Sequence, residues 1–167
     1  MNDPKSEPNL EIITDPDTPI VVTRRSVKAP RSLVYDAFTK PELVRRWKTP
    51  AGLEWVDAEL DLRAGGAWRV LYRTADGQEF GFHGLYLEVD PPARFVRTFV
   101  FGDGPEQELE ETVELQEEGA RTRIVTTTRY KSMAVRETLS RGRMDPELHY
   151  VRLDELLAEL LGAAASA

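Results

Sequence analysis

The sequence contains no cysteine and only two histidines, His83 and His149. Without cysteine the chain forms no disulfide and offers neither a thiolate metal ligand nor a cysteine nucleophile. Two histidines far apart in the chain, with carboxylates scattered over a charged face, make a poor metal-ligand set. No string resembles the nucleophile elbow of a serine hydrolase. We therefore expect no metal and no cofactor.

Long apolar runs are also missing. No segment approaches the roughly 18 uninterrupted apolar residues of a membrane span, and the N-terminus lacks the basic and apolar regions of a secretory signal. We expect a cytoplasmic protein without a membrane span. The 29 acidic and 22 basic residues give a net charge of -7, which repels the phosphates of nucleic acid. Nucleic acid is therefore not an expected partner.

A chain of 167 residues has the length of one ordinary domain. Residues 1–19 contain four of the eleven prolines among polar residues, a composition that orders poorly. We expect a flexible tail over 1–19, although its apolar residues offer a docking point. A single domain is expected over 20–162, and a frayed tail over 163–167.

Most of the chain has the spacing of short strands. A run rich in β-branched residues starts at Ile20 and predicts a first strand. Two short helices follow, the second opening with Pro41 in the favoured first position. Turn residues then separate six further strands, predicted over residues 53–62, 66–74, 79–89, 94–101, 108–117 and 120–130.

The last 35 residues switch to a helical period, with Leu153, Leu156, Leu157, Leu160 and Leu161 on one stripe. A sheet with one apolar face and a helix with one apolar stripe bury those surfaces against each other. We predict an α+β fold: a curved antiparallel sheet of about seven strands, with the long C-terminal helix packed across its concave face.

This order of elements and five local strings resemble the Hsp90 ATPase activator homologue branch of the START-like, or SRPBCC, superfamily. The strings are RSVKAPRSLVYDAFTKPELVRRW, DLRAGGAWRV, DGQEFGFHGLYLEVDPPARFVRTF, EEGARTRIVTTT and RLDELLAEL. The resemblance covers residues 20–161. It implies a helix-grip fold whose cavity, between sheet and long helix, holds lipids, polyketides, hormones or other apolar molecules across the superfamily.

One string departs from the pattern of these relatives, which continue smoothly into the last helix. Here the chain reads Gly142-Arg143-Met144-Asp145-Pro146. Proline inside a helix removes a hydrogen bond and clashes with the preceding turn. We predict a kink or a new helix start near Asp145, with Asp145 as its N-cap.

The hairpin around Glu118-Gly119 predicts which side chains face inward. With these two residues as the loop, Leu115 pairs with Thr122, and Glu111 pairs with Thr126 on the same face. An inward carboxylate among apolar residues and threonines is a candidate general acid or an anchor for a polar ligand group. The alternative is that Glu111 lies near the sheet edge in water, or that a bulge turns it outward.

The two histidines are further candidates. His149 precedes Leu153 by one helical turn and thus lies on the stripe facing the sheet, or it remains half exposed near the helix start. His83 faces inward with Tyr72 if Ala75 pairs with Gln78, whereas a longer turn places Phe82 there instead.

Several aromatic residues fall on predicted strands, and a few with polar tips suit a cavity wall. We select Trp68, Tyr72, Phe99 and Tyr130 as ligand-binding candidates, together with Thr126 and Leu153. The leading hypothesis is a module that binds a small apolar or amphipathic molecule.

Two other functions stay open. The resemblance implies contact with a chaperone ATPase in the stress response, and some relatives elsewhere in the superfamily are cyclases or dehydratases. A metal-free cyclase, dehydratase or hydrolase would use Glu111 with a histidine. A sheet edge left exposed is compatible with either a monomer or a homodimer.

Overall fold

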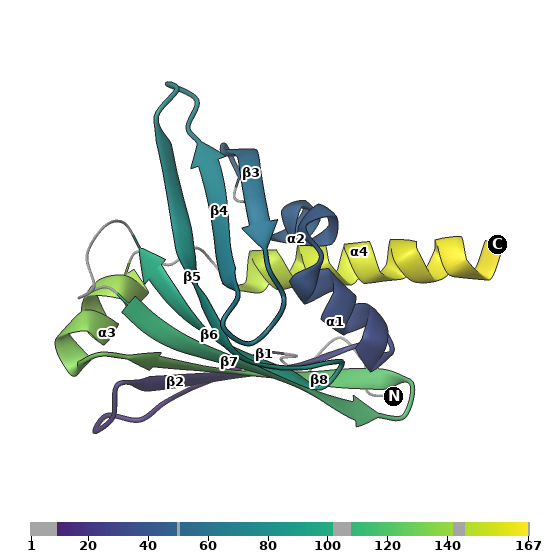
Figure 1. The fold of residues 1–167 in the computed structure, drawn as a ribbon. Helices are drawn as coiled ribbons and strands as arrows, with labels where there is room; N and C mark the ends of the chain where they lie inside the picture. Colours follow the sequence, from purple (N-terminus) through teal and green to yellow (C-terminus); the bar gives the residue numbers. More distant parts are fainter. Residues whose placement is uncertain (1–9, 50, 102–107, 142–145, 167) are drawn as a thin grey trace.

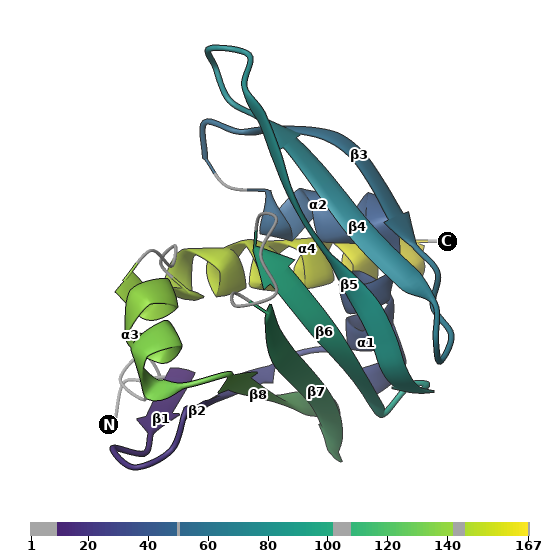
Figure 2. The same cartoon turned by 60° about the vertical axis from the view of Figure 1, so that its left-hand side comes forward.

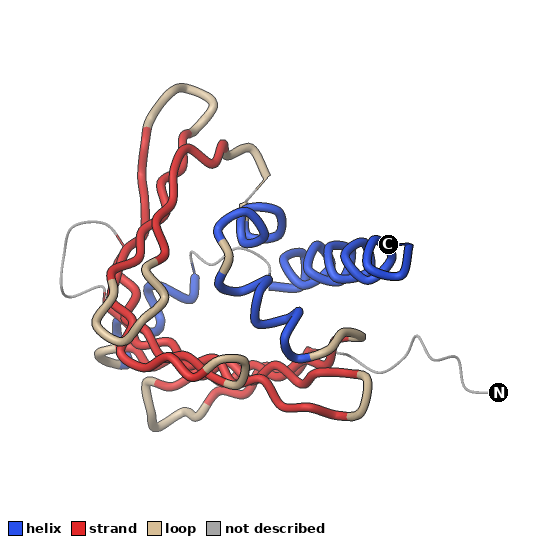
Figure 3. Tube along the Cα trace, turned by 45° about the vertical axis from the view of Figure 1, so that its right-hand side comes forward, coloured by secondary structure: helices blue, strands red, loops and turns tan. Residues whose placement is uncertain are grey.

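The computed structural model describes residues 10–49, 51–101, 108–141 and 146–166. One strongly bent antiparallel sheet holds three helices inside its bend and a fourth at one end (Figures 1 and 3). The elements follow the chain in the order β1 (Leu10–Thr14), β2 (Ile20–Val27), α1 (Arg31–Thr39), α2 (Pro41–Lys48), β3 (Glu54–Leu60), β4 (Ala67–Arg73), β5 (Glu79–Asp90), β6 (Arg94–Phe101), β7 (Glu108–Glu118), β8 (Arg121–Tyr130), α3 (Met133–Arg141) and α4 (Pro146–Ser166).

The sheet has the strand order β1-β2-β8-β7-β6-β5-β4-β3. From β3 to β8 each strand pairs with the next along the chain, so these six strands form the predicted meander. β2 then joins the far side of β8 and brings the chain's first long strand beside its last. Figure 2 shows the result: α4 crosses the concave side, with α1 and α2 alongside it. The α+β helix-grip prediction is confirmed.

Two elements differ from the sequence-based expectation. The sheet has eight strands rather than about seven, because Leu10–Thr14, inside the expected tail, forms β1 and pairs with β2. Ile12 and Ile13 of this edge strand remain exposed. The strand therefore has no buried face that an apolar pattern in the sequence could have indicated. The second difference is α3, which was not predicted. It packs Val135 and Leu139 on β8 beside Tyr130.

The long helix begins at Pro146, as the predicted new helix start requires, and it extends to Ser166, beyond the expected domain end at residue 162. The proposed N-cap, Asp145, lies outside the described residues. α4 buries Leu153, Leu156 and Leu157 against the sheet, α1 and α2. Polar contacts fix its two sides: Arg46 of α2 pairs with Glu159, and Arg25 of β2 pairs with Asp154.

Candidate functional site

The β7–β8 hairpin turns one residue later along the chain than expected. Glu118 pairs with Arg121, so the loop is Gly119-Ala120, and Gly119 adopts a φ of 65°. The pairing therefore shifts by two residues, and Glu111 lies opposite Thr128 instead of Thr126. Because side chains alternate with a period of two, this shift leaves every side chain on its predicted face. Glu111 does face inward.

Glu111 forms an ion pair with Arg97, its direct partner on β6. The Arg97 Nη2 and Nε atoms lie 2.8 and 2.9 Å from the same Glu111 oxygen. The side chains are only 6% and 14% exposed, so both charges are held inside the grip. The sequence reasoning missed Arg97, although it lies between Phe95 and Phe99 at the spacing of a single strand face. The interior holds a charge pair, not a lone carboxylate.

Aromatic rings surround the Arg97 guanidinium. It lies 4.2 Å from the centre of the Trp68 ring, a close cation–π contact, and 5.7 Å from that of Phe99. The Trp68 indole N–H donates to the Thr98 carbonyl oxygen at 2.9 Å, which fixes the ring over the cation. Burial raises the pKa of Tyr86, whose phenol also lies close enough to Arg97 for that cation to oppose the rise.

A band of hydroxyl groups continues this polar region across β8 and β2. Thr126 lies opposite Thr23 in the pairing of these strands. The Tyr150 hydroxyl of α4 interacts with both threonines, while burial raises the pKa of Tyr150. Tyr150 precedes Leu153 by three residues, so the helical spacing that selected Leu153 was also a signal for Tyr150. The helix and the sheet thus meet through polar atoms at this end of α4.

Arg25 marks the outer limit of the band on β2. Its guanidinium lies 4.8 Å from the centre of the Tyr150 ring and pairs with Asp154 one turn further along α4. Burial raises the pKa of Asp154 despite the opposing effects of Arg25, Arg121 and Lys28. Partial burial of the Asp154 carboxylate, together with a smaller effect of Glu155, therefore outweighs the effect of the three nearby cations on its pKa.

The aromatic candidates form one continuous row of tilted and edge-to-face ring contacts, the aromatic row. The ring centres of Trp68 and Phe99 are 4.9 Å apart, those of Phe99 and Phe82 are 5.2 Å apart, and those of Phe82 and Tyr72 are 5.9 Å apart. Tyr130 of β8 belongs to a small hydrophobic cluster against which Phe99 also packs. The structure thus brings four predicted site residues together around Arg97 and Glu111.

The residues of the candidate site fall into two groups, one buried and one partly exposed. Trp68, Tyr72, Tyr130 and Leu153 are buried. Phe82, Phe99, Glu111, Thr126 and Tyr150 remain partly exposed on the inner face. Four of these residues gather at one end of the grip. They are Phe99 near the end of β6, Glu111 near the start of β7, Thr126 in the second half of β8 and Tyr150 near the start of α4. This end of the grip is where an outside molecule would meet the polar band.

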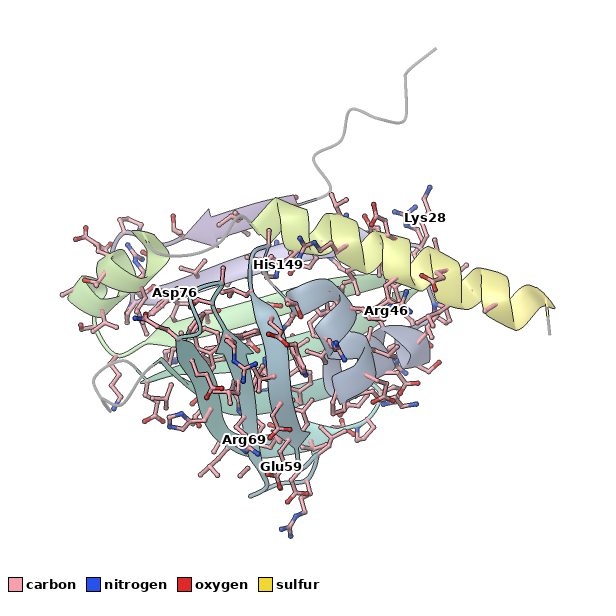
Figure 4. All side chains as sticks on the ribbon, turned by 90° about the horizontal axis from the view of Figure 1, so that it is seen from above. Lys28, Arg46, Glu59, Arg69, Asp76 and His149 are labelled. Atoms are coloured by element: carbon pink, nitrogen blue, oxygen red, sulfur yellow. The ribbon has the colours of Figure 1, made fainter. Side chains whose placement is uncertain are left out.

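The two histidines are not part of the aromatic row. Val70 pairs with Phe82 and Arg69 with His83, so the longer of the two weighed turns is present and the inward placement of His83 is wrong. His83 is exposed on the outer face, where it lines a hollow of about 560 Å³ that also reaches Trp68 and Leu85. His149 lies near the start of α4 and is partly exposed (Figure 4). A joint role of His149 and Glu111 in acid–base chemistry stays a prediction.

The described part of the chain holds no group of three or more His, Asp or Glu side chains placed to bind a metal ion. Among the same residues, no helix has the length and apolarity needed to cross a membrane.

The bent sheet, the two short helices inside it and the long helix across its concave face define a START-like helix-grip domain. The model of the Activator of Hsp90 ATPase homolog 1-like protein family matches residues 28–161, and the chain belongs to this family. No protein with a curated description matches the chain.

Solved bacterial structures share the fold. A Rhodobacter sphaeroides protein is 22% identical, with a TM-score of 0.82 over 90% of this chain and 99% of its own. A Nitrosomonas europaea protein is 24% identical, with a TM-score of 0.76 over 88% and 98%. The CalU16 protein of Micromonospora echinospora is 22% identical, with a TM-score of 0.58 over 92% and 87%. At these identities the likeness is one of fold.

Proposed function

We propose that this protein binds a small amphipathic molecule at the accessible end of its grip, between the inner face of β6, β7, β8 and β2 and the start of α4. The apolar part of the ligand packs on Phe99 and Phe82, the partly exposed rings of the aromatic row. Its polar part reaches Glu111, Thr126 and Tyr150. Family membership supports a ligand-binding helix-grip domain, and the polar band supports a ligand that has a polar group as well as an apolar part.

The observation that carries the proposal is the Arg97–Glu111 pair, two charges held inside the grip between aromatic rings and a band of hydroxyl groups. Removing two charges from water is costly, and a well-packed apolar pair of similar volume is often as stable or more stable. The pair is therefore poorly explained by stability alone. A polar ligand group beside it would have a fixed donor and a fixed acceptor, which gives orientation and specificity.

The apolar half of the site is equally defined. Aromatic rings supply a large rigid surface at little cost in side-chain entropy, and each buried ring contributes strongly to ligand affinity. Phe82 and Phe99 are partly exposed, and they contact the buried rings of Tyr72 and Trp68 respectively. A ligand with a ring or short alkyl chain next to a hydroxyl or carboxyl group fits this arrangement.

Thr126→Val tests the proposal with a matched control on the same strand. Valine keeps the shape of threonine and removes the hydroxyl from the inner face; Thr127→Val makes the same change on the outer face. Native mass spectrometry with lipid and polyketide panels identifies a ligand, and calorimetry measures its Kd. Loss of one neutral hydrogen bond predicts about two- to tenfold weaker binding for Thr126→Val. Thr127→Val should bind like the wild type.

Two results would contradict this proposal. One is that no member of the panels binds to the purified protein. The other is that both valine variants lose the same affinity, because that loss would then come from a general effect on β8. Phe99→Ala extends the test to the apolar half, and it should weaken binding further than Thr126→Val does.

The name of the matched family favours a second proposal, contact with a chaperone ATPase. A partner of that kind would use the outer surface of the domain and leave the grip free. Stimulation of the ATPase of the cognate Hsp90 by the purified protein tests it. Thr126→Val should leave that stimulation unchanged, so the two proposals are separable.

A further inference from the structure

A second concave region lies beside α4, on the side of the helix that faces away from α2 (Figure 4). A groove of about 1030 Å³ runs between the end of β2, the β7–β8 hairpin and the C-terminal half of α4. Lys28 marks this side of α4, while Arg46 of α2 lies on the opposite side of the helix (Figure 4). Glu111, Thr126 and Phe99 are not among the residues that line it. The groove therefore adjoins the polar band at Arg25 and Asp154 and contains none of the residues assigned to the proposed ligand site.

The groove is basic although the chain is acidic. Five of its lining side chains are basic (Arg24, Arg25, Lys28, Arg121 and Arg123) and three are acidic, in a chain of net charge -7. A concave surface with an excess of one charge concentrates ligands of the opposite charge. The groove thus favours an anion.

Lys28 and Arg121 account for the excess of positive charge in the groove, because the other three basic side chains lie near carboxylates. Arg25 pairs with Asp154, and Arg24 and Arg123 lie 4.0 and 3.8 Å from carboxylates of neighbouring strands. For Lys28 and Arg121, no ion pair is found within the described ranges. Both are exposed, and both line the groove together with Asp154, on which they act electrostatically.

Apolar side chains of α4 and β2 line the same groove. Leu157 and Val27 are buried at its base, Leu161 is partly exposed, and Ala158 is exposed between them. Leu157, Ala158 and Leu161 lie within little more than one turn of α4, so the apolar strip runs along the helix axis. A ligand that uses the whole groove needs both a negative charge and an alkyl segment.

We propose that this groove binds a linear anionic amphiphile. Its acidic head lies between Lys28 and Arg121, and its alkyl chain lies along Ala158 and Leu161. A free long-chain acid and an anionic membrane lipid share this chemistry, and the experiment below distinguishes the two sources.

Octane-1-sulfonate is the probe, because its charge does not change with pH. Calorimetry compares it with butane-1-sulfonate and with neutral octyl glucoside. A methylene that becomes fully buried improves affinity about fourfold, so the longer sulfonate should bind at least about tenfold more tightly than the shorter one. The neutral octyl compound should bind more weakly than octane-1-sulfonate, since it lacks the charge.

Two variants test the location. The double variant Lys28→Gln/Arg121→Gln should weaken octane-1-sulfonate binding about tenfold or more. Ala158→Glu, at an exposed helical position, adds a negative charge to the wall and should do the same. Arg45→Gln/Arg129→Gln removes two exposed cations that lie outside the groove, and it is the matched control. Thr126→Val should not change the affinity, so this test is independent of the proposed grip site.

Vesicles identify the source of the amphiphile. Co-sedimentation with phosphatidylglycerol vesicles, absent with phosphatidylcholine and reduced by the groove variants, assigns a membrane lipid; binding of octane-1-sulfonate alone assigns a free acid. The proposal is overturned if octyl glucoside binds as well as the sulfonate. It is equally overturned if the control pair weakens binding as much as the groove pair, or if the sulfonate does not bind.

Discussion

The Arg97–Glu111 pair should show strong coupling when its two members are replaced separately and together. The variants are Arg97→Met, Glu111→Leu and their combination, each of which substitutes an apolar side chain of similar length. Either single change leaves one charge at a site where the partners are 6% and 14% exposed. An uncompensated buried charge costs about 3–5 kcal/mol.

The double variant leaves no charge behind. Replacing a buried pair by apolar residues is often neutral, so we expect its stability to lie within about 2 kcal/mol of the wild type. Urea unfolding followed by circular dichroism gives the four free energies of unfolding. For a domain of this size, each single variant should lose about 6–20 °C in Tm.

The same two strands provide the control. Arg94 and Glu114 pair across β6 and β7 on the outer face, where their side chains are 36% and 37% exposed. An exposed pair contributes about 0–1 kcal/mol, so the cycle Arg94→Met/Glu114→Leu should give weak coupling. The reasoning about the inner pair is refuted if its coupling is no larger than that of the outer pair.

Three further predictions concern packing and protonation. Gly84→Ala should destabilise the fold by about 1–3 kcal/mol in urea unfolding, because a Cβ there lies 1.9 Å from the Thr98 carbonyl oxygen. The folded-state pKa of Asp154 is raised, so the wild type should gain stability relative to Asp154→Asn as the pH falls through that raised value toward the ordinary one. Burial raises the pKa of Tyr35 and of Tyr72 to about 12, so their phenolate absorbance should appear only in strongly alkaline solution.

Each of these has a result that contradicts it. Gly162→Ala is the control for Gly84, because an added Cβ there meets nothing within 4 Å, and alanine should stabilise α4 by up to about 1 kcal/mol. Equal effects at the two glycines would exclude the close approach at Gly84. Wild-type stability that falls relative to Asp154→Asn on acidification would mean that the pair with Arg25 dominates over burial. A phenolate step near pH 10 that Tyr72→Phe abolishes would show that Tyr72 is solvated.

Local patterns determined most of the elements of this protein. Turn residues and β-branched runs marked the strands from β2 to β8, and Pro41 and Pro146 marked the starts of α2 and α4. These signals work because backbone conformation at a turn or helix start depends on the residues at that place. Alternation along β7 also assigned Glu111 to the inner face, since a register error of two residues does not change the face.

Only the tertiary structure decided which side chains meet. Arg97 and Glu111 lie on neighbouring strands whose register depends on a loop, and a sequence does not show that register directly. The inward choice between Phe82 and His83 depended on the length of one turn, where a single residue reverses every side chain of the strand. β1 and α3 carry weak local signals, and their places come from pairing with β2 and packing on β8. Long-range contacts of this kind combine residues that no local pattern links, and they form both the polar band inside the grip and the basic groove beside α4.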